Sequence, residues 1–300
     1  MDSSQDELVV LSWNIERNGR GRENNDANRQ LAHLVMARYR PHILFRQELA
    51  GAWENGRRDL HEEANALGGL IPFMPAPKEG RSRKPVGVMV DPTLFQIDAQ
   101  VEHDLPWKQI CHVQVRLRGC PTPIQLASAH LCHFDPQLRA TEARRLTDLA
   151  DHGRTALIGM DANSYPHRTA DEVTEPIGWD EMNDPVHYQQ RTVERNGARI
   201  PDTGPSEILT GGRHIFTDLA HHAGTVLGQR GALAATASLR RTDQGPPQRI
   251  DIVLSTPDLA PALRSFEVVV TPEVRRVTDH GLLVARFQLS QFRRCLAGRT

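Results

Sequence analysis

The sequence predicts an α+β sandwich of sheets and helices, and two observations carry this prediction. Short apolar runs typical of strands recur along the whole of the 300 residues, and several follow one another with only a turn between them. Helical patterns separate the other runs, whereas a doubly wound parallel sheet needs a helix after nearly every strand. Because the chain has no internal repeat and no low-complexity linker, we expect one domain from 8 to 290, with short tails at 1–7 and 291–300.

The individual elements follow from local patterns. The stretch 111–117 alternates apolar and polar residues, as a half-buried strand does, and it is expected to pair with a strand at 124–129. A charged segment at 136–150 places its apolar residues on one face and predicts a helix. Residues 164–213 are rich in Pro, Asp, His and Gly and predict a long excursion, and long loops of this kind are often functional. The expected strands are 8–13, 42–46, 86–90, 111–117, 124–129, 155–160, 249–255, 265–271 and 282–289, and the expected helices lie near 26–40, 60–67 and 136–150.

The composition argues against several classes of protein. Thirty-six basic and 37 acidic residues give a formal net charge of −1, so no global positive field marks a nucleic-acid binder. No window approaches about 18 uninterrupted apolar residues, which argues against a membrane span. The acidic start at 1–7 lacks the features of a signal peptide, so we expect a cytoplasmic protein. The four cysteines show no CxxC spacing, and the basic runs at 17–22 and 78–84 are either solvated loops or a phosphate-contacting rim.

Side chains able to bind a metal or move a proton stand at the ends of the expected strands. Each of them has an ordinary explanation when taken alone, such as a helix cap or an Asx turn. Asp251 is the sharpest case, because a carboxylate within an apolar strand must be paired or lie near a cation. The groups are Asn14, Glu16, Gln47, Glu48, His130, Asp161, Asn163, Asp251, Asp279 and His280.

The order and spacing of these groups resemble the endonuclease/exonuclease/phosphatase superfamily, the deoxyribonuclease I-like metal-dependent phosphoesterases. The resemblance extends from about Val9 to Leu289 and implies a four-layer α/β/β/α sandwich with the active site at one rim. Met160 is inserted after the glycine of the usual Gly-Asp-x-Asn motif, and Asp151-His152-Gly153 is set aside as a false match because it follows a helix. The motifs are Ser12-Trp13-Asn14-Ile15-Glu16, Arg46-Gln47-Glu48, Ser128-Ala129-His130-Leu131, Gly159-Met160-Asp161-Ala162-Asn163, Arg249-Ile250-Asp251 and Thr278-Asp279-His280.

The resemblance implies a divalent-metal site. Glu48 corresponds to the principal Mg²⁺ ligand, and Asn14, Glu16 and Asp279 are expected to bind the metal directly or through water. Oxygen ligands without a Cys-His cluster favour Mg²⁺, with Mn²⁺ as a substitute, over Zn²⁺.

The resemblance also implies the catalytic residues. Asp161 corresponds to the residue that orients or deprotonates the attacking water, and Asn163 to the one that steadies the phosphate. His280 is expected to contact the phosphate, with Asp251 holding its tautomer, and His130 faces the scissile phosphate. We expect imidazolium donors here to stabilise the developing charge, and a pH optimum shaped by their titration.

The function predicted from the sequence is metal-dependent hydrolysis of a phosphodiester in nucleic acid. Asn163 and Arg249 are expected to bind the substrate, and the excursion at 164–213 to shape it. The alternative is a phosphomonoesterase acting on a small-molecule or lipid phosphate, although only 5% of the residues are aromatic, which disfavours membrane docking. A third hypothesis is a non-catalytic binding module of the same fold. The sequence indicates no membrane span and no obligate protein partner.

Overall fold

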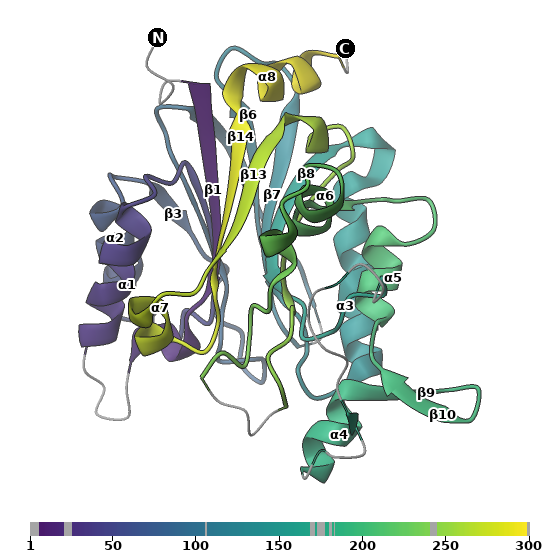
Figure 1. The fold of residues 1–300 in the computed structure, drawn as a ribbon. Coiled ribbons are helices and arrows are strands. Elements are labelled where there is room, and N and C mark those ends of the chain that lie inside the picture. Colours follow the sequence, from purple (N-terminus) through teal and green to yellow (C-terminus); the bar gives the residue numbers. More distant parts are fainter. Residues whose placement is uncertain are drawn as a thin grey trace.

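Two six-stranded sheets lie face to face with helices on their outer sides, as the computed structural model shows (Figure 1). This arrangement confirms the predicted α+β class and the four-layer α/β/β/α sandwich of the deoxyribonuclease I-like fold. The structure describes residues 6–20, 26–105, 107–168, 172, 178–179, 182, 184–240 and 245–298.

The first sheet has the strand order β13-β14-β1-β2-β4-β3. Only β1 and β2 pair in parallel, and the other neighbours are antiparallel, which is why the mixed element order predicted a sandwich correctly. All residues of β1 from Leu8 to Asn14 are buried, because one face of this strand meets the second sheet and the other meets helices. The strands are β1 (Glu7–Asn14), β2 (Ile43–Gln47), β3 (Ile71–Phe73), β4 (Gly87–Val90), β13 (Leu263–Val269) and β14 (Leu282–Gln288).

The second sheet has the strand order β11-β12-β8-β7-β6-β5, with β7 and β8 as its one parallel pair. The two sheets approach closely at Gly159, where an added Cβ would lie 2.4 Å from a ring carbon of Phe45 in the first sheet. The glycine of the Gly-Met-Asp-Ala-Asn motif is therefore required by packing between the sheets. The strands are β5 (Phe95–Val101), β6 (Cys111–Leu117), β7 (Pro123–His130), β8 (Thr155–Asp161), β11 (Thr217–Asp218) and β12 (Asp251–Ser255).

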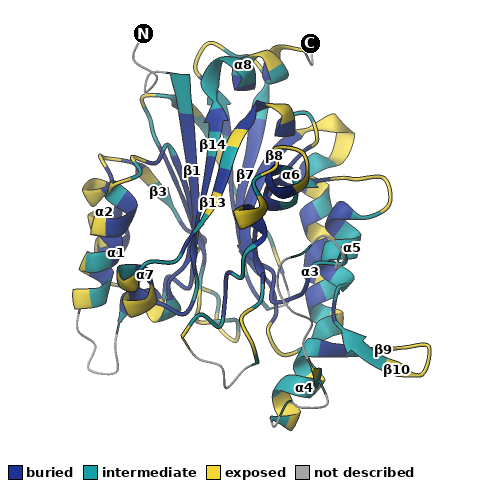
Figure 2. Ribbon diagram, viewed as in Figure 1, coloured by how far each residue is buried: buried dark blue, intermediate teal, exposed yellow. Residues whose placement is uncertain are grey.

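Apolar side chains form three layers that hold the sandwich together. The central layer joins the inner faces of the sheets and includes Phe45, Leu126 and Val253. A second layer lies between the first sheet and helices α1, α2 and α7, and a third lies under α3 and α5 (Figure 2). The helices are α1 (Ala27–Ala37), α2 (Glu54–Ala66), α3 (Pro136–Thr147), α4 (Pro185–Arg191), α5 (Gly204–Thr210), α6 (Leu219–Thr225), α7 (Pro272–Val277) and α8 (Leu289–Ala297).

Two segments differ from simple tails and loops. The expected C-terminal tail forms most of α8, because Phe292 and Leu296, four residues apart on one helical face, are fully buried against the core. The excursion at 164–213 contains α4, the hairpin of β9 (Thr192–Arg195) with β10 (Ala198–Pro201), and α5. Among the described residues, no helix combines the length and apolarity needed to cross a membrane.

Candidate active site

The catalytic candidates converge because several strands end at one rim of the sandwich. In register, His130 of β7 lies beside Asp161 of β8, and Asp161 lies beside Asp251 of β12. Residues in register on neighbouring strands point to the same side of a sheet, so these three side chains meet. His130 Nε2 is 3.3 Å from Asp161 Oδ2. The rim lies in the lower part of Figure 1. β1 of the first sheet runs down toward it and ends there at Asn14.

Asp161 is the buried carboxylate at the centre of the site. Asn14 Nδ2 donates to its Oδ2 at 2.8 Å, and the backbone N–H of Asn163 donates to its Oδ1 at 2.9 Å. Burial alone raises the pKa of Asp161, but the charges of His130, which is protonated in the acidic range where Asp161 titrates, and of His280 lower it well below its usual value. Asp161 is therefore ionised at neutral pH and accepts hydrogen bonds on both oxygens.

His280 and Asp251 form a hydrogen-bonded pair, in which the Asp251 side chain is buried and the His280 side chain is 17% exposed. His280 Nδ1 lies 2.9 Å from Asp251 Oδ2, and Trp13 Nε1 donates to the backbone carbonyl of His280 at 3.0 Å. Burial lowers the pKa of His280, but the charge and hydrogen bond of Asp251 outweigh this and raise the pKa to about 9. His280 is therefore an imidazolium at neutral pH, with the Nδ1–H held by Asp251.

Glu48 follows β2 and faces the same pocket. Its backbone has φ +60°, a left-handed conformation that turns the chain sharply after the strand. Lys84 Nζ donates to Glu48 Oε1 at 2.8 Å, and the backbone N–H of Arg17 donates to Oε2 at 3.1 Å. Burial raises the pKa of Glu48, but His130 and Lys84 together with these hydrogen bonds lower it to about 2.

The remaining predicted ligands, Glu16 and Asp279, line the same pocket as Glu48. Thr278 Oγ1 accepts from the backbone N–H of Glu16 and donates to the carbonyl of Asn14, both at 3.1 Å. The Glu16 carboxylate lies 3.4 Å from Arg240, whose backbone N–H donates to Asp279 Oδ1 at 2.5 Å. Glu16, Glu48 and Asp279 all line one pocket with Asp161 and His280.

The donor set of this pocket fits a hard divalent cation. Asn14 Oδ1 is buried and has no hydrogen-bond partner within the described part of the chain, and the carboxylates of Glu48 and Asp279 supply further oxygens. Buried polar atoms of this kind normally have a partner, and Mg²⁺ prefers such oxygen ligands. The tightest acidic-imidazole group is instead Asp161, Asp251 and His280, whose ligand atoms lie within 4.8 Å of one another. Because His280 is cationic and bonded to Asp251, we interpret that group as proton-handling machinery.

Two expectations about the site need correction. Arg249 does not reach the pocket, because its buried guanidinium forms ion pairs with Glu172 at 2.6 Å and Asp218 at 2.8 Å. It is a structural residue rather than a substrate ligand. His130 is not an imidazolium at neutral pH, since burial and the charge of Lys108 lower its pKa to about 3. The false motif at 151–153 was set aside correctly, because the His152 side chain is 82% exposed and residues 151–153 do not line the pocket.

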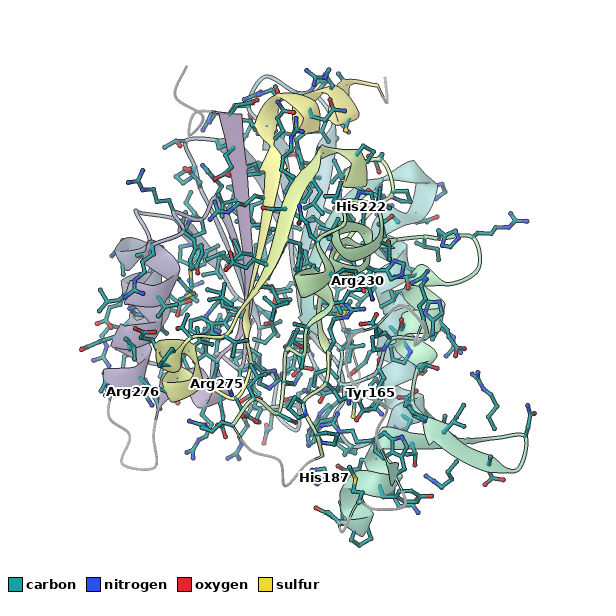
Figure 3. All side chains as sticks on the ribbon, viewed as in Figure 1. Tyr165, His187, His222, Arg230, Arg275 and Arg276 are labelled. Atoms are coloured by element: carbon teal, nitrogen blue, oxygen red, sulfur yellow. The ribbon has the colours of Figure 1, made fainter. Side chains whose placement is uncertain are left out.

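Several pocket residues were missed by sequence reasoning. Arg191, at the end of α4, donates to the side-chain oxygen of Asn163 at 2.8 Å and to its carbonyl at 3.1 Å. Tyr165 and His187 also line the pocket from the excursion, and Figure 3 labels both in the lower half of the molecule. Lys84 lies in the basic run at 78–84, and the other three residues lie in the excursion at 164–213 that was expected to shape the substrate, but no local motif marked them individually.

Known structures share this fold over nearly the whole chain. An endonuclease/exonuclease/phosphatase protein from Bacteroides vulgatus superposes with a TM-score of 0.65 at 12% identity, covering 94% of this chain and 99% of its own. TDP2 of D. rerio, complexed with single strand DNA product, gives 0.62 at 15% identity, covering 94% and 98%. A mannosyl-6-phosphatase from Bacteroides thetaiotaomicron gives 0.58 at 12% identity, covering 93% and 98%. No family model and no curated protein matches the sequence. The fold is thus that of the endonuclease/exonuclease/phosphatase proteins.

Proposed function

We propose that this protein is a divalent-metal-dependent phosphodiesterase that hydrolyses nucleic acid. The observation that carries the proposal is the convergence, in one pocket, of an ionised carboxylate, an imidazolium and an oxygen-rich ligand set, contributed by Asp161, His280 and Glu48. A phosphodiester is difficult to hydrolyse because its anionic oxygens repel a nucleophile. A bound Mg²⁺ supplies charge neutralisation at those oxygens, and Glu48, Asn14, Asp279 and Glu16 are the residues that would hold it.

Each catalytic side chain has a role that its environment supports. Asp161 has a low pKa, which makes it a weak base, so it acts mainly by accepting a hydrogen bond from the attacking water and orienting it. His280 carries a positive charge and donates from Nε2 to the phosphate as charge develops there. Neutral His130 lies beside Asp161 and faces the pocket, where it can donate to the leaving oxygen.

The wall made by the excursion favours a polymeric substrate. Arg191 clamps Asn163, and His187 and Tyr165 extend the pocket beyond the reacting centre. A pocket lined beyond the reacting centre suits the second group of a phosphodiester, and the structural neighbour TDP2 is complexed with single strand DNA product. The second candidate function is that of a phosphomonoesterase, because a mannosyl-6-phosphatase is also among the proteins of similar fold. The ionised, fully assembled set around Asp161 argues against a binding module without catalysis.

The decisive experiment is nicking of supercoiled plasmid and cleavage of single-stranded oligonucleotides with Mg²⁺ or Mn²⁺. Chelator and the Asp161→Asn variant serve as controls. Metal-dependent cleavage that disappears in both controls supports the proposal. If neither DNA nor RNA is cleaved while a phosphate monoester is hydrolysed under the same controls, the second candidate replaces it.

A further inference from the structure

Three aromatic rings form a continuous shelf beside the pocket. The rings of Trp107 and Phe134 pack edge to face with centroids 5.5 Å apart, and those of His133 and Phe134 pack in the same way at 5.2 Å. Phe134 is 39% exposed, although large apolar side chains normally lie inside a fold. We call Trp107, His133 and Phe134 the aromatic shelf.

The aromatic shelf is continuous with the catalytic pocket. His133 lines the pocket together with Glu48, Lys84 and His130. The backbone N–H of Ser82 donates to the carbonyl of Trp107 at 3.3 Å, which ties the shelf to the loop that carries Lys84. A ligand whose phosphate lies among these pocket residues therefore has the shelf as its immediate neighbour.

A buried cation, Lys108, follows Trp107 of the aromatic shelf directly in the sequence. Lys108 is 4% exposed, and its Nζ has no hydrogen-bond partner among the residues that the structure describes. Its charge acts on Asp161, His130 and His133, so it lies close to the reacting centre. The indole N–H of Trp107 is likewise buried without a described partner. The carboxylates of Asp161, Glu48 and Glu142 act on the charge of Lys108 through space, but its Nζ donates no hydrogen bond among the described residues. Buried polar atoms normally have a hydrogen-bond partner, and a phosphate oxygen is an acceptor that would complete this one.

We propose that the aromatic shelf stacks a nucleobase adjacent to the scissile phosphate, with Lys108 supplying positive charge to that phosphate. Stacking on aromatic rings tolerates every base, because each has a π face. The proposal rests on the proposed function and deepens it, since it places single-stranded or locally opened nucleic acid in the site.

The test measures binding separately from cleavage. The Asp161→Asn variant, as a non-hydrolysing background, is titrated with a labelled single-stranded oligonucleotide by fluorescence anisotropy. A second oligonucleotide series carries an abasic residue at each successive position. We expect Phe134→Ala to weaken binding about 10-fold, and one abasic position to weaken binding equally. The two changes together should cost no more than either alone, whereas Phe134→Trp should bind as the parent does.

Trp53→Ala is the matched control, because Trp53 is an aromatic residue of similar exposure, 37%, that does not line the pocket. If Phe134→Ala in the Asp161→Asn background binds as tightly as that background alone, the proposal that the aromatic shelf stacks a base is wrong, whether or not the wild type cleaves the oligonucleotide. Losses from Phe134→Ala that are the same on intact and abasic strands also overturn it. Base-dependent binding without cleavage refutes the proposed function while supporting the shelf, and no binding to any oligonucleotide refutes both.

Discussion

Replacing Asp251 by Asn should lower the pKa of His280 into the neutral pH range. In the wild type the charge of Asp251 raises the pKa of His280 to about 9. Without that charge the pKa falls toward the ordinary 6.5, since burial and the remaining carboxylates of Asp161 and Glu48 act in opposite directions. At pH 8 a group with a pKa of 9 is about 90% protonated, whereas one with a pKa of 6.5 is about 3% protonated. We therefore expect kcat/KM at pH 8 to fall about 30-fold and to recover on acidification toward pH 6.

The assay is a pair of measurements on the same variants. Histidine side-chain NMR reports the pKa of His280 directly, with His280→Gln identifying its signal among those of the 14 histidines. The pH profile of kcat/KM then shows whether the alkaline limb moves with that pKa. A His280 pKa that stays near 9 in Asp251→Asn would refute the electrostatic reasoning, and a moved pKa with an unmoved limb would remove the imidazolium from catalysis.

The same pair predicts how stability depends on pH. Because the folded-state pKa of His280 is raised above its unfolded value, the charge of His280 contributes stability that is fully present below about pH 6.5. Burial raises the pKa of Asp251 to about 6, which lowers stability between about pH 4 and 6 and has no further effect above about pH 7. The contribution of His280, about 3 kcal/mol from a shift of about 2.5 pH units, is lost as the pH rises through 9. Thermal unfolding should show that alkaline loss in the wild type and not in Asp251→Asn.

Three further predictions concern residues whose surroundings the structure defines. Arg249→Met should destabilise the fold by about 3–5 kcal/mol, because it leaves Glu172 and Asp218 buried without their cation; a melting temperature unchanged in calorimetry would contradict this. Asp161→Asn should lower kcat by about 10²–10⁴-fold with little change in melting temperature, and a folded variant of full activity would exclude Asp161 from the mechanism. Glu48→Gln should weaken Mg²⁺ binding in isothermal titration calorimetry, and an unchanged dissociation constant would show that Glu48 is not a ligand.

Local sequence patterns determined the architecture and most of the site. Strand periodicity and the short spacing between β6 and β7 predicted the sandwich, because alternation and turn length are read from neighbouring residues. The polar groups at strand ends could also be predicted from the sequence, because the last residues of a strand that ends at the rim of the sandwich lie at that rim. This reasoning placed His130 and Asp161 at the carboxyl ends of their strands, and the structure puts both there, in register with Asp251, the first residue of β12.

Tertiary structure alone decided which of these groups meet in the pocket and in what charge state. β12 begins at Asp251 rather than at Arg249, so Arg249 lies outside the regular strand and pairs with Glu172, 77 residues away in the chain. His130 is neutral and His280 cationic, although both are histidines at the rim, because one meets Lys108 and the other Asp251. Charge, burial and pairing are properties of neighbours brought together by folding, so no local pattern of the sequence contains them.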